Sequence, residues 1–487
     1  MDLWPLWPFD CTKRRCDKDI YAIGGNFRIG RPETKLTAKG NTQKGLVIGH
    51  MRKNQLILLV TASALGYFVD AYDLIIFSVV RQQSLTDLGV GSAASLQVGL
   101  SLLNYQMIGL LLGGILLGSL GDKKGRLTVL FISILVYSLA NILNGFVTGL
   151  AAYKLLRFIA GVGLAGELGA GIAIVSEVLS PIRRGIGTMI VATFGLLGAA
   201  VAALVGTSLP WRTSFLVGGA MGLALLMMRI GLVESGVYAS IKARPVSKGN
   251  FFALFSSRRR ALTYLRCIGI GLSTYFVVGL LVTGAPEFGK TLGLSAAPVA
   301  GTAILVCYLS MSVGDVFCTA LSQFSRSRRL PLAIFNGIVL FGTLMFIYVP
   351  PVTLAGFYFR CAVVGFGCGF WSLVVTNAAE QFGTNLRATV ATTVPNFIRG
   401  ALVPIAFVFG VLKPHLGLLH SAAIIGVVTS CVGLISVAAS RETFGTDLNF
   451  VESVGHSHEK LLESVHHNPF GDGQGVHSDR AVTSRSI

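Results

Sequence analysis

The chain has 487 residues, of which 53% are hydrophobic and only 13% are charged, and its formal net charge is +18. A water-soluble protein of this length needs far more polar surface to cover its core, so the composition excludes a soluble enzyme. The mean hydropathy of +0.70 instead predicts a polytopic α-helical membrane protein.

Twelve apolar runs are long enough to cross a bilayer as helices. In chain order they occupy residues 55–80, 97–119, 127–147, 150–179, 185–207, 211–233, 262–285, 297–320, 330–350, 352–379, 387–411 and 417–439. Six runs precede a polar segment and six follow it, which predicts two pseudo-symmetric six-helix bundles. The expected parts are a cytoplasmic tail (1–54), an N-terminal bundle (55–233), a basic cytoplasmic linker (234–261), a C-terminal bundle (262–440) and a polar tail (441–487).

Lysine and arginine gather on alternate loops. They cluster in the first 54 residues, at 123–126, 182–184 and 326–329, and within 242–260, whereas the loops between carry few. The positive-inside rule then places both termini and the linker in the cytoplasm. Because topology accounts for this charge, we expect the lipid bilayer and no nucleic acid as a partner. Without a cleavable signal, the first span is expected to direct insertion, into a bacterial inner membrane.

Cysteine and histidine predict no cofactor. Six of the eight cysteines lie within spans, where cysteine behaves as a small hydrophobic residue. The histidines of the polar tail are irregularly spaced, so no metal site is expected. No Ser/His/Asp grouping occurs in the spans, and we expect no enzyme activity.

Two segments of the sequence repeat one another at a constant offset of 203. RFIAGVGLAGELGAGIAIVSEVLSPIRRG, which begins at residue 157, aligns with RCAVVGFGCGFWSLVVTNAAEQFGTNLRA, which begins at residue 360. The matched pairs are Arg157 with Arg360, Gly166 with Gly369, Glu177 with Glu380, and Arg184 with Arg387. Parallel repeats of six spans, with a substrate site between them, are a transporter architecture.

The loop after the second span reads GSLGDKKGRL, residues 118–127. Gly118 permits close helix approach, Gly125 permits a tight turn, and Asp122 can accept from arginine or from a helix N-terminus. Such a cluster would hold the cytoplasmic side closed and break when that side opens. The simpler alternative is a positively charged turn.

This loop resembles the cytoplasmic signature of the major facilitator superfamily, G-x-x-x-D-[RK]-x-G-R-[RK], with Leu127 in place of the last basic residue. The residues that match the signature are Gly118, Asp122, Lys123, Gly125 and Arg126. The resemblance implies that the same cytoplasmic gate includes Glu177, Arg184, Glu380 and Arg387. Ordinary helix-end charges are the alternative. The second-half counterpart has Gln323 in place of the acid, so the gate is expected to be asymmetric.

The first span carries two carboxylates, Asp70 and Asp73, in the run LGYFVDAYDLIIFSVV. Three residues apart, they share a helical face with Tyr67 on the same side. They cannot both face lipid, because a carboxylate near the bilayer centre costs about 3 kcal/mol or more. Either they pair permanently with arginine from another span, or they line a wet cavity and carry protons.

The fourth span contains G-x-G-x-x-G in RFIAGVGLAGE. A dinucleotide site would need a preceding strand, so the small residues predict close helix packing instead. Glu167 falls near the middle of this span, where a structural ion pair or a proton pathway would explain it. FVDAYDL and RFIAGVGLAGE together resemble the proton-coupled symporters of the superfamily that carry phosphate, organic acids or similar metabolites. Leu168-Gly169, where phosphate carriers show Tyr-Pro, counts against phosphate.

The second repeat has Val278 and Leu281 at the aspartate positions of the first. Proton coupling is therefore expected in the N-terminal bundle, at Asp70, Asp73 and Glu167. The C-terminal bundle offers Arg399 near the middle of the eleventh span, and a guanidinium fork suits a carboxylate or phosphate. The predicted substrate contacts are Arg399, Asn396, Arg360 and Tyr67. The alternative is that Arg399 neutralises Asp315 or another buried acid.

Three functions remain open. The first is proton-coupled symport of a small, polar, anionic metabolite by alternating access, carried out by a monomer and driven by the proton gradient. The second is a proton-antiport exporter of drugs, siderophores or metabolites, which would use the same acids. The third is a transporter-like sensor or scaffold, which predicts no flux and tolerance of Asp70→Asn.

Overall fold

The computed structural model describes residues 53–124, 126–167, 169, 171, 181–234, 251–349 and 353–446, and at a few helix ends beside the gaps only the backbone is described. These residues all belong to one compact unit, His50–Ile487. Regular structure within these ranges is entirely helical, and nine of the helices found there are long and apolar enough to cross a membrane. The predicted all-α membrane fold is confirmed.

The first half of the chain forms long helices that coincide with expected spans. They are α1 (Lys53–Asp87), α2 (Ser92–Lys124), α3 (Arg126–Asn144), α4 (Leu150–Leu164), α6 (Pro181–Ser208) and α7 (Trp211–Glu234). Helix α1 continues beyond the expected end at residue 80, because Arg81, Ser84 and Leu85 are buried by neighbouring helices instead of lying in an exposed loop.

The second half contains more interrupted helices. They are η1 (Phe251–Phe255), α9 (Arg258–Phe276), the π-helical η2 (Val277–Val282), α10 (Ala285–Thr291), α11 (Ala300–Ser325), α12 (Arg329–Tyr348), α13 (Leu354–Gly367), α14 (Trp371–Glu380), α15 (Thr384–Gly400) and α16 (Leu402–Ala439). Helix α16 breaks at Gly417, whose φ of 74° lies in the left-handed region that favours glycine. The last two expected spans meet at this break.

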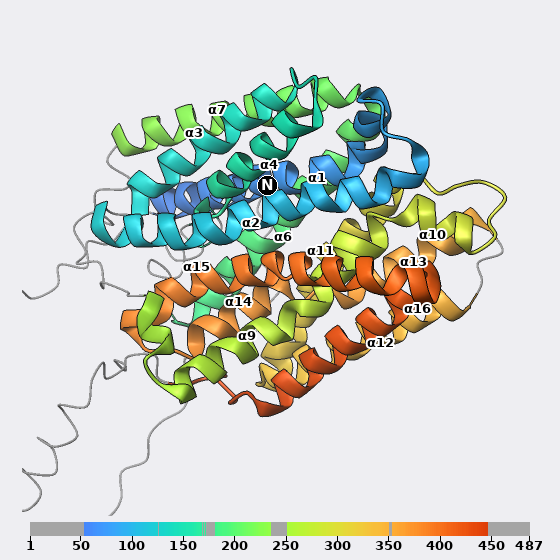
Figure 1. Cartoon of the computed structure of the whole chain (residues 1–487). Helices are drawn as coiled ribbons and strands as arrows, with labels where there is room; N and C mark the ends of the chain where they lie inside the picture. Colours follow the sequence, from blue (N-terminus) through green and yellow to red (C-terminus); the bar gives the residue numbers. More distant parts are fainter. Residues whose placement is uncertain are drawn as a thin grey trace, which may run out of the picture. The chain divides into compact units, whose positions relative to one another are not determined.

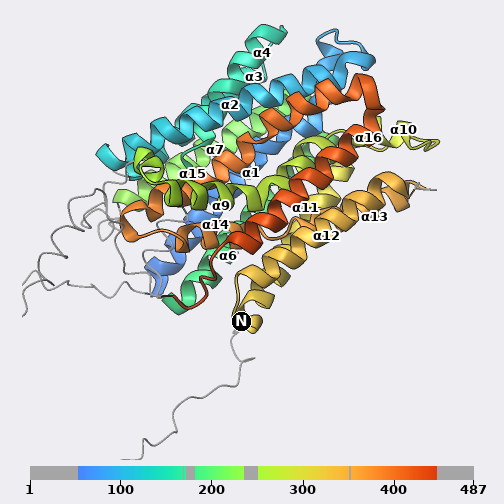
Figure 2. The same cartoon turned by 60° about the horizontal axis from the view of Figure 1, so that its bottom comes forward.

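The helices gather in two bundles. In Figure 1, α2, α3, α4 and α7 lie in the upper part and α9, α12 and α14 in the lower part; in the rotated view of Figure 2, α2–α4 lie on the opposite side of the molecule from α12 and α13. In the first bundle α1 packs against α6 and α7, and α4 packs against α2 and α3. In the second, α9 packs against α16, and α13 against α11 and α12. The bundles meet mainly where α6 lies against α11 and α2 against α15. This interface positions the candidate site.

Close helix packing at the fourth span follows from its glycines, as expected from the sequence. A Cβ atom added at Gly161 would lie 2.0 Å from the carbonyl oxygen of Gln106, and one at Gly109 would lie 2.1 Å from that of Phe158. Neither contact is possible for a larger residue, so these glycines let α2 and α4 touch through their backbones.

Candidate functional site

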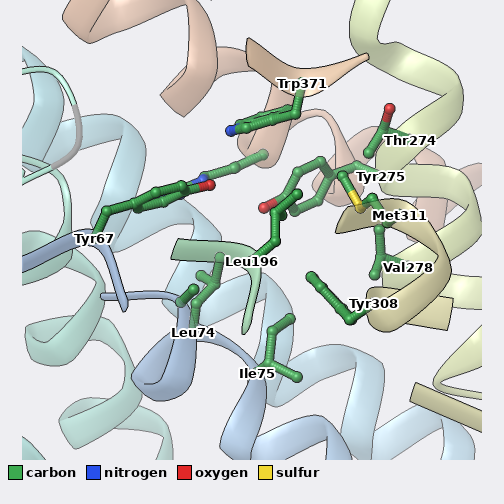
Figure 3. Close-up of a pocket in the computed structure, with 12 residues that line it drawn as sticks. Tyr67, Leu74, Ile75, Leu196, Thr274, Tyr275, Val278, Tyr308, Met311 and Trp371 are labelled. Atoms are coloured by element: carbon green, nitrogen blue, oxygen red, sulfur yellow. The ribbon is translucent and has the colours of Figure 1, made fainter. Parts of the chain in front are cut away.

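A small cavity lies between the two bundles, and four aromatic side chains and one arginine contribute to its wall. Tyr67 comes from α1, Tyr275 from α9, Tyr308 from α11, Trp371 from the start of α14, and Arg399 from α15. Figure 3 shows that Tyr67, Tyr275 and Trp371 converge from three different helices. The cavity volume is about 20 Å³, which is enough for one water molecule and too small for an organic substrate. The described conformation is therefore closed around this site.

Arg399 and Asp70 form an ion pair across the bundle interface. Arg399 Nη2 donates to Asp70 Oδ2 at 3.1 Å, and the two side chains are 1% and 0% exposed. The guanidinium carbon also lies 5.9 Å from the ring centres of both Tyr67 and Trp371, a cation–π distance. The sequence left open whether Arg399 binds substrate or neutralises a buried acid. In this conformation it neutralises Asp70.

Several buried polar atoms around this pair lack a hydrogen-bond partner within the described part of the chain. On the donor side they are Arg399 Nε, Arg399 Nη1 and Trp371 Nε1, and on the acceptor side Asp70 Oδ1. Leaving such groups unpaired costs about 1–3 kcal/mol each, and more for charged groups. The site thus holds more hydrogen-bonding capacity than the protein itself uses, and most of it is donor capacity.

Asp73 has different neighbours from Asp70, although the two lie three residues apart. It faces α7, where a Cβ atom at Gly218 would lie 2.4 Å from its Oδ1. Both of its carboxylate oxygens are buried and have no hydrogen-bond partner among the described residues. Nearby, Arg157 Nη2 donates to Asn141 Oδ1 at 2.6 Å and stacks on the Phe215 ring at 4.7 Å. Asp73 therefore sits inside the N-terminal bundle and does not line the cavity.

Glu167 is bound to an arginine of its own bundle. Arg229 of α7 donates through Nη1 to Glu167 Oε2 at 3.0 Å and through Nη2 to Glu167 Oε1, with both side chains at most 2% exposed. Arg229 Nη2 also contacts the carbonyl oxygen of Ala62 in α1. Of the two alternatives left open for Glu167, the geometry favours the structural ion pair.

The other predicted substrate contacts lie apart from the cavity. Asn396 Nδ2 donates to the carbonyl oxygen of Ala165 at 2.8 Å, so it joins the two bundles without lining the cavity. Arg360 is 7% exposed and also does not line the cavity. The structure thus brings together Tyr67, Asp70 and Arg399, and separates Asp73, Glu167, Asn396 and Arg360 from them.

Most of the expected cytoplasmic gate lies outside the described side chains. This applies to Gly118, Asp122, Lys123, Gly125, Arg126, Glu177 and Arg184. Glu380 is described, and it pairs with Arg328 at 3.0 Å. Arg387 donates to the carbonyl oxygen of Ala379 at 3.2 Å. In the C-terminal bundle, Glu380 therefore pairs with Arg328, the residue just before α12.

A second ion pair joins the two bundles near the end of α1. Arg81 Nη2 donates to both carboxylate oxygens of Glu287 in α10, at 2.8 and 2.9 Å, and to the carbonyl oxygen of Thr283 at 3.3 Å. Arg81 is fully buried, and the Glu287 side chain is 20% exposed. Arg81 follows the first expected span, which ended at residue 80, and its contact with Glu287 was not predicted from the sequence. The only sign of this contact in the sequence is that Arg81 is a charged residue at the end of a long apolar run.

Sequence reasoning named Tyr67 and Arg399 but missed the other three aromatic residues of the cavity wall and Arg229, the partner of Glu167. Tyr275, Tyr308 and Trp371 are ordinary residues of apolar spans, and no local pattern sets them apart. Arg229 carried a usable signal, because an arginine within an apolar span needs a buried acid to pair with.

Comparison with known proteins agrees with this architecture. The sequence profile of the Major Facilitator Superfamily matches residues 63–403. The niacin transporter of Acinetobacter baylyi is 26% identical over 435 residues, covering 82% of this chain and 96% of the relative. The 3-(3-hydroxy-phenyl)propionate transporter of Escherichia coli is 28% identical over 343 residues, covering 68% and 79%. A Bacillus subtilis protein named for niacin and nicotinamide transport is 30% identical over 190 residues; this match covers 38% of the chain and only 46% of that relative.

Proposed function

The chain belongs to the Major Facilitator Superfamily, and we propose that it is a proton-coupled symporter of a small aromatic carboxylate. The observation that carries this proposal is the fully buried Arg399, which is paired with Asp70, keeps two N–H groups without a partner among the described residues, and is surrounded by aromatic rings. Transport as such follows from the family, and the chain is an integral multi-pass membrane protein. The substrate class and the proton coupling are our proposal.

A carboxylate is the ligand chemistry that best matches the unpaired groups. Arginine binds carboxylates through two parallel N–H···O bonds. Arg399 Nε and Nη1 have no hydrogen-bond partner in the described chain, and either nitrogen can form such a pair together with Nη2 once Asp70 releases it. The indole N–H of Trp371 adds a third donor. With a neutral ligand, Asp70 alone would have to neutralise the guanidinium charge of Arg399.

An aromatic ring is favoured by the side walls of the cavity. Tyr67, Tyr275, Tyr308 and Trp371 offer flat apolar faces, and offset or edge-to-face ring contacts contribute about 0.5–1.5 kcal/mol each. The relatives named for niacin and 3-(3-hydroxy-phenyl)propionate carry cargoes that combine an aromatic ring with a carboxylate. Their names support this substrate class for the present chain.

The Asp70–Arg399 pair offers a route to proton coupling. While Asp70 is ionised it occupies Arg399, and an anionic substrate must displace it. Protonation of Asp70 removes its charge, so the guanidinium becomes available to the substrate carboxylate. The loaded site then holds one arginine, one neutral aspartic acid and one anion. Its net charge equals that of the unloaded site, so one proton accompanies each monoanionic substrate.

Asp70 and Asp73 remain our proposed proton sites, with unequal roles. Asp70 competes with substrate for Arg399, whereas Asp73 lies within the N-terminal bundle and its carboxylate oxygens have no hydrogen-bond partner among the described residues. For Glu167 we propose a structural role, because Arg229 neutralises it within one bundle. We further propose that the protein works as a monomer in a bacterial inner membrane, with the basic loops and both termini in the cytoplasm.

The test is uptake into proteoliposomes containing the purified protein, with and without an inward proton gradient. Radiolabelled benzoate and nicotinate are the probes, and cyclohexanecarboxylate is the matched control because it keeps the charge and loses the aromatic ring. We expect gradient-driven accumulation of an aromatic acid and at least tenfold weaker uptake of the control. Release driven by an opposing gradient would indicate an antiport exporter, and no flux of any probe would favour a sensor.

A further inference from the structure

The tenth span is broken next to the cavity. Helix α13 ends at Gly367 and α14 begins at Trp371, with three residues between them. Trp371 is 2% exposed, lines the cavity, and has its ring centre 6.0 Å from that of Tyr275. A helix start leaves its first N–H groups without partners in the helix, so this break places an aromatic wall at the site together with backbone donors that need acceptors from elsewhere.

A buried carboxylate from α11 satisfies the start of α14. Asp315 Oδ1 accepts hydrogen bonds from the backbone N–H and from the side-chain hydroxyl of Ser372, both at 2.9 Å. Asp315 is 0% exposed, and no arginine or lysine lies within ion-pair distance of it among the described residues. Its charge is therefore compensated by the positive end of the α14 dipole and by hydroxyl groups.

The second oxygen of Asp315 reaches the other bundle. Thr193 of α6 donates from Oγ1 to Asp315 Oδ2 at 3.1 Å. Helices α6 and α11 form one of the two main contacts between the bundles. One carboxylate thus joins the wall of the cavity in the C-terminal bundle to a helix of the N-terminal bundle.

The backbone at this point leaves Asp315 little freedom. A Cβ atom added at Gly369 would lie 2.5 Å from the Cα atom of Gly314 and 2.6 Å from the backbone nitrogen of Asp315. The break between α13 and α14 therefore rests directly on the backbone of α11. Sub-ångström shifts of one element must displace the other, because the contact is between main-chain atoms.

We propose that Asp315 is a positioning residue for the substrate cavity: it fixes the first turn of α14, and with it Trp371, relative to Arg399, and it ties this wall to α6 of the other bundle through Thr193. The contact chain is Thr193, Asp315, Ser372 and Trp371, whose ring centre lies 5.9 Å from the guanidinium carbon of Arg399. Asp315 does not line the cavity. The inference rests on the proposed function, because it assigns the specificity of the same site.

Two substitutions of Asp315 that give the same net charge distinguish the effect of its hydrogen bonds from the effect of its charge. In Asp315→Asn the amide oxygen can still accept both bonds from Ser372, and the amide N–H can donate to Thr193. In Asp315→Ala all three bonds are lost. Both variants remove the negative charge. We expect the KM for benzoate or nicotinate uptake to stay within about twofold of wild type in Asp315→Asn and to rise roughly tenfold in Asp315→Ala, with the maximal rate changed less.

Trp371 supplies a readout that does not depend on transport. The chain has four tryptophans, at positions 4, 7, 211 and 371, and replacing the other three by phenylalanine leaves Trp371 as the sole fluorophore. We expect acrylamide to quench Trp371 at least twofold more strongly in Asp315→Ala than in Asp315→Asn. If Asp315→Ala fails to fold, the double variant Thr193→Val/Ser372→Ala removes the two hydroxyl donors and should raise the KM roughly threefold to tenfold.

The proposal would be overturned if Trp371 quenching were equal in Asp315→Asn and Asp315→Ala and the two variants also had the same KM or were both inactive. Loss of function in both with unchanged Trp371 quenching would mean that the charge matters and the position does not. Failure of the wild-type protein to carry any aromatic carboxylate would refute the proposed function instead. In that case the quenching comparison still decides whether Asp315 positions Trp371.

Discussion

The two helical bundles place the buried charges of their described residues in different ways. The N-terminal bundle pairs Glu167 with its own Arg229. The C-terminal bundle contributes Arg399, which pairs with Asp70 of the other bundle. An ion pair inside one bundle persists while the bundles rock against each other, whereas a pair between bundles can be exchanged in every cycle. Under the proposed mechanism, the two buried arginine–carboxylate pairs therefore differ in role by their place relative to the interface: Glu167–Arg229 is structural, and Asp70–Arg399 exchanges partners.

The largest effect is expected at Arg399. Arg399→Ala leaves the Asp70 carboxylate buried without its partner, which should lower the free energy of unfolding by about 3–5 kcal/mol. The variant also lacks the proposed substrate anchor. We expect aromatic-acid uptake to fall more than 100-fold. Arg399→Lys keeps the charge but loses the planar fork, so it should recover only part of the activity. Near-normal uptake by Arg399→Ala would show that the ion pair between the bundles is dispensable for transport, which contradicts the difference drawn between it and Glu167–Arg229.

Glu167 and Arg229 should affect stability and leave transport intact. Glu167→Gln leaves Arg229 as a buried charge without its acid, so we expect the free energy of unfolding to fall by about 3 kcal/mol. The double variant Glu167→Leu/Arg229→Met removes both charges and should recover most of the loss. Thermal unfolding in detergent measures this, with uptake per folded molecule as the second readout. If the double variant folds but cannot accumulate substrate, the structural role is wrong and Glu167 takes part in proton coupling.

Asp70→Asn should uncouple transport without abolishing binding. The amide mimics the protonated acid and frees Arg399 for substrate at every pH. We expect gradient-driven accumulation to fall about tenfold or more, while counterflow exchange of labelled for unlabelled substrate continues. Asp73→Asn, in the same helix, tests the second proposed proton site while leaving the Asp70–Arg399 pair in place, and it should also lower accumulation. If Asp70→Asn still concentrates substrate, the exchange of partners at Arg399 is not the coupling step.

The Arg81–Glu287 pair is expected to control access from the end where α1 finishes. Glu287→Gln weakens a charge-assisted bond that contributes about 1.5–3 kcal/mol, so the closed state should lose roughly a factor of ten in stability. Leu196→Cys, placed in the cavity wall of a cysteine-free variant, should then react several-fold faster with an impermeant thiol reagent. Lys290→Gln, on the same short helix, is the control. Unchanged labelling would show that this ion pair is not a gate.

The smallest effect is expected at Glu442, beyond the last helix. Although burial raises the pKa of its carboxyl, hydrogen bonds from Ser327 and from the backbone of Arg328, Phe444 and Arg329 lower it to about 2. The folded-state pKa thus lies below the ordinary 4.5, so the stabilisation is present above pH 4.5 and disappears as the pH falls towards 2. Because the group is largely exposed, we expect Glu442→Gln to cost at most about 1 kcal/mol.

The pH profile of uptake between pH 5 and 8 should be the same in Glu442→Gln and wild type, since Glu442 stays ionised throughout that range. A shifted profile in this variant would place a coupling group at the end of the bundle instead of at the interface.

Local sequence predicted the helices well and their interruptions poorly. The twelve apolar runs and the glycines of the fourth span are properties of short segments, so composition and spacing are sufficient to find them. The break at residues 368–370 was missed because the surrounding sequence is continuously apolar. That break depends on Asp315, a residue of another helix, which accepts the hydrogen bonds of the new helix start.

The candidate site divides in the same way. The sequence alone determined that Asp70, Asp73, Glu167 and Arg399 need special surroundings, because desolvating a charge is costly wherever the chain places it. Only the tertiary structure decided that Arg399 meets Asp70, that Arg229 meets Glu167, and that Asp73 meets neither. Pairing depends on which helix faces lie together across bundles, and residues 329 positions apart carry no local pattern that records their contact.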